Sequence, residues 1–110
     1  MKYTVLIADD SKLQRVILKE NLKDIYDVAE ASCGQECLDL VENSEGKIDV
    51  VLLDIVMPGM DGFEVLRKRQ RSEIFKNIPV IVLTMSDMKE DQELAEQLGA
   101  DGLTFGFVRF

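Results

Sequence analysis

Five short apolar runs, separated by segments of helical periodicity, constrain the fold of this chain most strongly. The third and fourth runs are nearly continuous Val, Ile and Leu, which is typical of strands buried on both faces of a parallel sheet. The alternation of strands and helices predicts one doubly wound α/β domain over residues 1–110, with right-handed crossovers and helices on both faces of the sheet. The expected strands cover residues 3–8, 27–33, 48–53, 79–84 and 102–108. One expected helix begins at Ser11, and three others cover residues 35–43, 63–71 and 88–98.

The first predicted helix carries a start signal. Ser11 is followed three residues later by Gln14, which is the spacing of a capping box at a helix N-terminus. Helical spacing then predicts a stripe of side chains that this helix buries against the sheet. The expected stripe consists of Leu13, Val16 and Ile17.

Charge and hydropathy exclude several classes of function. The formal net charge is −8, so direct binding to nucleic acid or to an anionic membrane is not expected, because both repel an acidic surface. No apolar run approaches the ~20 residues of a membrane span. The first residues also lack the pattern of a signal peptide, and a cytoplasmic location is therefore expected. The basic run at residues 67–71 is predicted to be the solvated face of a helix rather than a docking patch.

The two cysteines, Cys33 and Cys37, do not predict a metal site. The chain contains no histidine and no second cysteine pair to complete a zinc shell. A disulfide between them is disfavoured in the cytosol. We expect two reduced thiols that serve as small apolar side chains.

Acidic residues follow two of the predicted strands. Asp9 and Asp10 come directly after the first strand, Asp54 follows the third, and Thr84 ends the fourth. Ligands of a parallel α/β sheet bind outside the carboxyl ends of the strands. If the first and third strands are neighbours, three carboxylates converge there, and a hard divalent cation would relieve their repulsion. Mg²⁺ suits such a site, since it prefers oxygen ligands in octahedral geometry.

Four segments in register resemble one known family. "VLIADDS", "VVLLDIVMPGMDG", "VIVLT" and "LGADG" are similar in order and separation to the receiver domain of bacterial two-component response regulators, from residue 3 to about residue 103. This resemblance implies a flavodoxin-like five-stranded parallel sheet in the order 2-1-3-4-5. It also implies phosphoryl transfer from a sensor histidine kinase or a phosphotransfer protein, and a signalling role rather than an enzymatic one.

The same resemblance implies a role for each site residue. Asp54 takes the position of the phosphoacceptor. Asp10 takes that of a direct Mg²⁺ ligand, and Asp9 that of an acid that reaches the metal largely through water. The backbone carbonyl of Val56 is expected to be a further ligand, and Asp54 itself contributes to the metal site. Thr84 matches the hydroxyl that hydrogen-bonds the phosphoryl group.

The resemblance fails near the end of the chain. The family places a lysine after the fifth strand, where this chain has Gly106 or, with a one-residue gap, Phe105. Leu103 stands where the family usually has an aromatic switch residue. Met85 follows Thr84 where a small residue is common.

The chain ends before the fifth helix of the family, so the domain is expected to be incomplete at its C-terminus. That helix would cover part of one sheet face, and uncovered apolar surface marks an interface. A further segment of a longer protein, a second copy in a homodimer, or an exchanged element could supply the cover. The effector domain or downstream protein is not in this chain.

Three other functions compete with a phosphate-accepting receiver. The first is a phosphorylation-impaired pseudo-receiver that acts as a protein-interaction module, which the missing lysine favours. A Mg²⁺-dependent phosphatase is disfavoured because Val56, two residues after Asp54, is not a general acid. A flavin-binding flavodoxin is disfavoured because the loop after the first strand is acidic, where a phosphate site needs donors.

Overall fold

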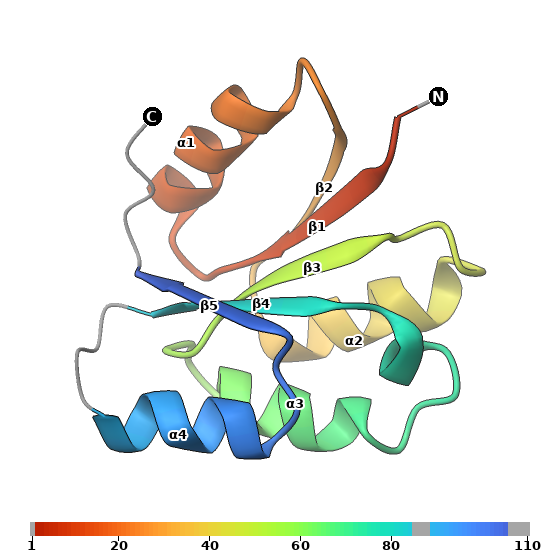
Figure 1. Ribbon diagram of the computed structural model, residues 1–110. Helices are drawn as coiled ribbons and strands as arrows, with labels where there is room; N and C mark the ends of the chain where they lie inside the picture. Colours follow the sequence, from red (N-terminus) through yellow and green to blue (C-terminus); the bar gives the residue numbers. More distant parts are fainter. Residues whose placement is uncertain (1, 85–88, 106–110) are drawn as a thin grey trace.

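Five parallel strands form one sheet at the centre of the computed structural model, which describes residues 2–84 and 89–105 (Figure 1). The order is β2-β1-β3-β4-β5, as expected, and all four strand pairs are parallel. The strands are Thr4–Ala8 (β1), Asp27–Ala31 (β2), Val50–Asp54 (β3), Val80–Thr84 (β4) and Gly102–Phe105 (β5). The helices are Lys12–Leu22 (α1), Gly34–Asn43 (α2), Gly62–Arg69 (α3) and Lys89–Gln97 (α4), with a 3-10 turn at Phe75–Asn77.

The helices lie on both faces of the sheet, which confirms the predicted doubly wound, flavodoxin-like architecture. Helix α1 lies on one face, and α2, α3 and α4 lie together on the other (Figure 1). Each βα crossover returns the chain to a parallel strand, so the carboxyl ends of all five strands meet at one edge of the sheet. This edge carries the site described below.

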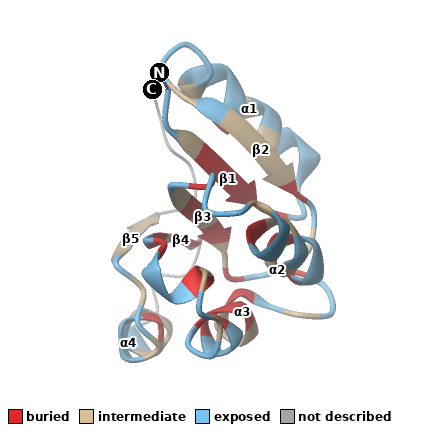
Figure 2. Cartoon of the chain, turned by 90° about the vertical axis from the view of Figure 1, so that its right-hand side faces the viewer, coloured by how far each residue is buried: buried red, intermediate tan, exposed pale blue. Residues whose placement is uncertain are grey.

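The larger core lies between the sheet and the three helices α2, α3 and α4. Figure 2 shows buried residues concentrated in the central strands, whereas the edge strands β2 and β5 are mostly half-buried. Phe75, in the 3-10 turn, is the largest fully buried side chain of this core. The face toward α1 has a smaller core, which consists of Val5, Ile7, Leu18 and Leu83.

The predicted buried stripe of α1 was wrong for Leu13 and Val16, whereas Ile17 is half-buried. Leu13 is 69% exposed and Val16 is 45% exposed, whereas Leu18 is the buried residue of this helix. Val16 lies two residues from Leu18 and therefore points to the opposite side of the helix. Among the described residues, α1 is the only helix on this face, so it buries one narrow stripe against the sheet. The capping expectation is confirmed in part, since the Gln14 N–H donates to Ser11 Oγ at 3.2 Å.

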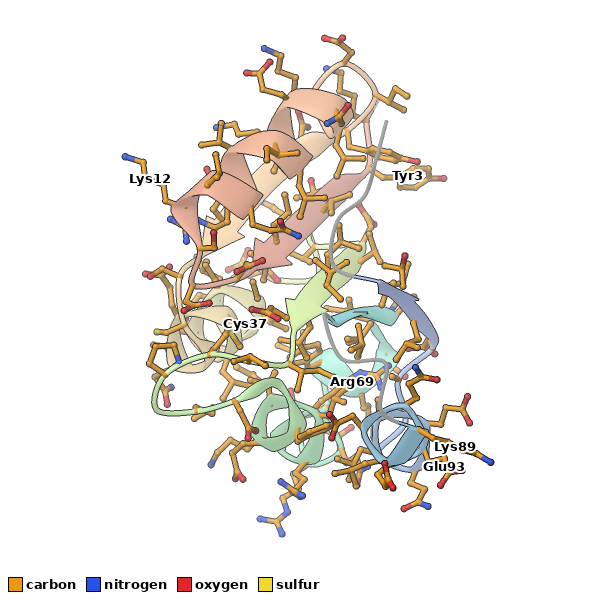
Figure 3. All side chains as sticks on the ribbon, turned by 90° about the vertical axis from the view of Figure 1, so that its left-hand side faces the viewer. Tyr3, Lys12, Cys37, Arg69, Lys89 and Glu93 are labelled. Carbon is orange, nitrogen blue, oxygen red and sulfur yellow. The ribbon has the colours of Figure 1, made fainter. Side chains whose placement is uncertain are left out.

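The basic run at residues 67–71 is not uniformly solvated, which corrects the sequence prediction. Arg69 is only 7% exposed and lies inside the layer of helices, as Figure 3 shows. Its guanidinium donates to the carbonyls of Ile78 and Gly99 and to the Asp101 carboxylate at 2.9 Å. These partners come from segments far along the chain, so local periodicity could not reveal them.

The two cysteines are free thiols, as expected. Cys37 is fully buried in the larger core, and burial raises the pKa of its thiol to about 12.

Within the described part of the chain, no helix is long and apolar enough to cross a membrane.

Candidate functional site

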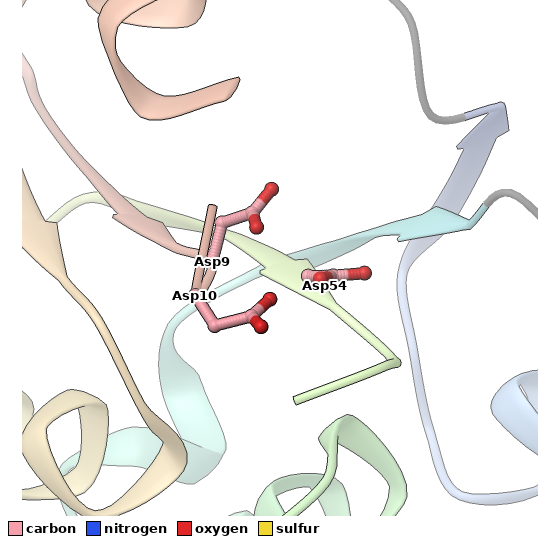
Figure 4. Close-up of side chains that lie close together, drawn as sticks. All are labelled: Asp9, Asp10 and Asp54. Carbon is pink, nitrogen blue, oxygen red and sulfur yellow. The ribbon is translucent and has the colours of Figure 1, made fainter. Parts of the chain in front are cut away.

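Three carboxylates converge at the carboxyl edge of the sheet. Strands β1 and β3 are neighbours, and Ala8 pairs with Leu53 in their register, so the next residue on each strand brings Asp9 beside Asp54. Asp10 follows directly, and Figure 4 shows the three side chains gathered at the ends of these strands. One carboxylate oxygen from each residue lies within 4.8 Å of those from the other two. The predicted convergence of Asp9, Asp10 and Asp54 is present.

Backbone amides hold two of these carboxylates. The Ser11 N–H donates to Asp9 Oδ1 at 2.9 Å, and the Val56 N–H donates to Asp54 Oδ1 at 3.2 Å. Each bond runs from an amide two residues further along the chain, which is the geometry of an Asx turn. Asp9 is 4% exposed, Asp54 is half-buried and Asp10 is exposed. The cluster therefore reaches from the interior to the solvent.

The surroundings of the cluster favour the protonated form of two acids. Burial, followed by the charge of Asp9, raises the pKa of Asp54 from 3.8 to about 7, against the opposing effect of the Val56 amide. Burial likewise raises the pKa of Asp9, and the hydrogen bond from the Ser11 amide opposes this shift. Among the described residues, the charge of Arg15 opposes the rise in the Asp9 pKa but does not outweigh the effect of burial.

The donor set fits a hard divalent cation. Among the described residues, no lysine or arginine forms an ion pair with Asp9, Asp10 or Asp54. Anionic oxygen donors that lie close together and form no ion pair suit Mg²⁺, which retains several waters and takes one or two carboxylates. The residues present therefore fit the ion that the sequence predicts.

The loop between β3 and α3 packs directly against the acidic cluster. Gly62 begins α3, and its N–H donates to the Ile55 carbonyl at 2.8 Å. A Cβ at Gly62 would lie 2.5 Å from the Asp54 carbonyl oxygen, so only glycine allows this close approach. Gly59 has a φ of 75°, which other residues rarely adopt, and it turns the loop. Asp61 caps α3 by accepting from the Glu64 N–H at 2.9 Å.

Two other predicted site residues, Val56 and Thr84, follow or end strands at this edge of the sheet. Val56 follows Asp54 by two residues, and its side chain is 71% exposed beside the site; its carbonyl as a metal ligand stays a prediction. Thr84 ends β4, next to the Leu83 that pairs with Asp54, but its side chain lies outside the described residues. Leu103 pairs with Val82 and packs half-buried against the larger core.

Positions 85–88 and 106–110, which include Met85 and Gly106, also lie outside the described residues.

Sequence reasoning missed Arg15. Its Nη1 donates to the backbone carbonyl of Asp9 at 2.6 Å, although it lies on α1. Nothing in the sequence distinguishes Arg15 from the other basic residues of this helix, because the contact depends on how α1 sits over the end of β1.

Three features together define a receiver domain. They are the strand order, the three aspartates at the strand ends, and the loop after β3 that packs closely against Gly62. The sequence matches the family model described as response regulator receiver domain over residues 5–105. The chain belongs to this family. Its members are flavodoxin-like signalling modules of two-component systems, and Mg²⁺ binding and phosphorylation are typical of them.

Three similar proteins illustrate the match. The chain is 37% identical over 102 residues to a probable cyclic di-GMP phosphodiesterase of Vibrio cholerae; the match covers 93% of this chain and 23% of that protein. It superimposes on the Vibrio cholerae chemotaxis protein CheY4 with a TM-score of 0.88 and 28% identity, over 99% of this chain and 90% of the other. For the receiver domain of the Francisella response regulator 1452, the TM-score is 0.85 and the identity 30%, over 94% and 84% of the two chains.

Proposed function

We propose that this receiver domain, residues 1–110, accepts a phosphoryl group on Asp54 in a Mg²⁺-dependent reaction. The donor is a sensor histidine kinase or a phosphotransfer protein. The carboxylates of Asp9, Asp10 and Asp54, with the backbone carbonyl of Val56, hold the ion. The observation that carries this proposal is the convergence of three carboxylates from two neighbouring strands within 4.8 Å.

The transfer is a displacement at phosphorus. An ionised Asp54 oxygen attacks the phosphorus, the bond from phosphorus to the donor nitrogen breaks, and the imidazole leaves with the electron pair. The product is an acyl phosphate on Asp54. When bound, Mg²⁺ supplies positive charge that offsets both the incoming phosphoryl group and the surrounding acids. The chain's own residues keep Asp54 in place, through the Val56 amide and the close packing of Gly62.

Phosphorylation would then switch a partner-binding surface. Thr84 ends the strand next to β3, where its hydroxyl would hydrogen-bond the phosphoryl group. The output passes to an effector domain or a downstream protein in the cytoplasm, so the domain signals rather than catalyses a reaction on a metabolite. A homodimer contact or an exchanged element would cover the sheet face beside α1, because α1 is the only helix that the described residues place on this face (Figure 1).

A second candidate is a phosphorylation-impaired pseudo-receiver that acts as an interaction module. The sequence favours it at one point, because Gly106 or, with a one-residue gap, Phe105 occupies the position where the family has its lysine. That lysine would pair with the phosphoryl group. Its loss should impair coupling more than metal binding, since the three carboxylates remain.

Intact-mass analysis separates the two candidates. The protein is incubated with acetyl phosphate, with Mg²⁺ or with a chelator, beside an Asp54→Asn variant that keeps the size of the side chain. A gain of one phosphoryl group in the parent with Mg²⁺, absent with chelator and in the variant, supports phosphate acceptance. Mg²⁺ binding without any gain supports the pseudo-receiver, and the absence of both rejects both candidates.

A further inference from the structure

The position of Asp9 depends on a side chain outside the acidic cluster. Asp9 lies one residue past the end of β1. Three hydrogen bonds fix it there: its N–H donates to the Ala31 carbonyl at 3.0 Å, the Ser11 N–H donates to its Oδ1 at 2.9 Å, and Arg15 Nη1 donates to its carbonyl at 2.6 Å. The bond from Arg15 is the only one of the three made by a side chain of another element.

Glu30 of β2 anchors Arg15. Arg15 Nε lies 3.1 Å from Glu30 Oε1, and the Arg15 side chain is only 14% exposed. Lys19, one turn further along α1, approaches the other oxygen of Glu30 at 3.6 Å but is 49% exposed. Arginine can make the two contacts of Arg15 at once, because its planar guanidinium carries several donors in a fixed fork. A lysine ammonium has three donors, but all of them radiate from one nitrogen atom on a flexible stem rather than from a rigid fork.

Arg15 contacts the carbonyl of Asp9 and not its carboxylate. It therefore fixes the backbone between β1 and α1 without occupying the oxygens that face Asp10 and Asp54. A residue placed in this way holds a ligand in position and leaves it free to bind. Such outer contacts commonly control metal affinity.

We infer that Arg15, anchored by Glu30, is a positioning residue that aims the carboxylates of Asp9 and Asp10 at the bound cation. This inference rests on the proposed Mg²⁺ site and deepens it. The pair links the edge strand β2 to the metal site through α1, so a change at Glu30 reaches the site without touching a ligand.

Mg²⁺ affinity, measured by calorimetric titration well below the melting temperature, tests the inference. We expect Arg15→Gln to bind Mg²⁺ about tenfold more weakly than the parent. Glu30→Gln should weaken binding less, because Arg15 keeps its bond to Asp9. Arg15→Lys, which keeps the charge but not both contacts, should fall between the parent and Arg15→Gln. Lys19→Gln is the matched control: it removes the same charge from the same partner and should change the affinity less than twofold.

A measurement on the metal-free protein keeps the inference separate from the proposed function. Solvent exchange of the Ser11 amide, followed by NMR, reports whether Asp9 still holds its position. Arg15→Gln should speed this exchange severalfold, and Lys19→Gln should not. The exchange rate of the Ser11 amide tests the role of Arg15 even if the parent binds no Mg²⁺. Failure to bind Mg²⁺ would reject the proposed metal site but not the positioning of Asp9 by Arg15.

Two results overturn the inference. One is an Arg15→Gln variant that exchanges its Ser11 amide at the parent rate and binds Mg²⁺ as tightly as the parent. The other is a Lys19→Gln variant that shows the same losses as Arg15→Gln, since the effect would then be one of charge and not of position.

Discussion

At the scale of single residues, Asp54 combines two demands that oppose each other. Its position against β1 and the loop after β3 buries part of the carboxyl beside Asp9, and this raises its pKa to about 7. As a nucleophile toward phosphorus, however, the carboxyl must be ionised. Because of this conflict, the protonation state of Asp54 in the metal-free site depends on pH. A bound cation would stabilise the ionised carboxylate.

We predict that the metal-free protein loses stability as the pH rises from about 4 to about 7. In this window the folded state keeps a proton on Asp54, whose pKa is about 7, while the unfolded state, with the ordinary value of 3.8, has released it. One pKa unit corresponds to about 1.4 kcal/mol, and partial solvation of Asp54 reduces the effect, so we expect a loss of about 1–2 kcal/mol. Denaturant unfolding in chelator between pH 4 and pH 8 measures it.

Asp54→Asn serves as the control for this pH dependence. The amide does not titrate, so the variant should show a flatter profile and exceed the parent in stability above pH 7. Added Mg²⁺ should stabilise the parent there more than the variant. A parent whose stability rises across this window would contradict the assignment.

Val56 leads to a prediction about the lifetime of the phosphorylated state. Its exposed apolar side chain offers no amide or acid to orient an attacking water beside Asp54. We therefore expect the phosphorylated domain to lose its phosphoryl group slowly, over minutes or longer. Val56→Asn should shorten the lifetime severalfold in intact-mass time courses, and Val56→Leu should leave it unchanged. A lifetime of seconds in the parent would refute this role.

At the scale of elements, the start of α3 fixes the end of β3. Gly62→Ala would place a Cβ 2.5 Å from the Asp54 carbonyl oxygen and 2.7 Å from the Ile55 Cα, both backbone atoms. We expect a loss of about 1–3 kcal/mol in unfolding free energy, together with weaker Mg²⁺ binding. Gly102→Ala is a suitable comparison, since its Cβ would meet Ile81 at an ordinary 3.5 Å. Equal stability of the two variants in denaturant unfolding would argue against this packing role.

Arg69 joins three further elements. Its guanidinium binds the carbonyl before β4, the carbonyl after α4 and the Asp101 carboxylate, and Asp101 also accepts from the Val80 N–H at 2.9 Å. Arg69→Met should cost about 2–3 kcal/mol, because it leaves the buried Ile78 carbonyl without its donor and removes the bonds to Gly99 and Asp101. Arg67→Met, which breaks only the exposed pair with Glu64, should cost less than about 1 kcal/mol. Thermal unfolding of both variants measures the difference.

At the scale of the whole molecule, the sequence predicted the α/β alternation and the edge at which the site lies. Strands of β-branched residues with helical segments between them have few alternatives, and parallel strands bring their carboxyl ends together. The strand order came from the resemblance to the receiver family and not from periodicity. The trio of Asp9, Asp10 and Asp54 followed once β1 and β3 were taken as neighbours.

The failures have one cause. Leu13 and Val16 looked like core residues, and Arg69 looked solvated, because local spacing does not reveal what lies against a helix. Arg15 was missed for the same reason, since its partners are a carbonyl on β1 and a carboxylate on β2. The roles of Thr84 and of the Val56 carbonyl stay predictions.

Localisation of the phosphoryl group tests the central claim most directly. After incubation with acetyl phosphate and Mg²⁺, borohydride reduces an aspartyl phosphate to homoserine, which peptide mass spectrometry locates in the sequence. We expect homoserine at position 54, dependent on Mg²⁺ and absent without the phosphoryl donor. Homoserine at another aspartate, or none in a protein that binds Mg²⁺, would contradict the assignment of Asp54 as the phosphoacceptor.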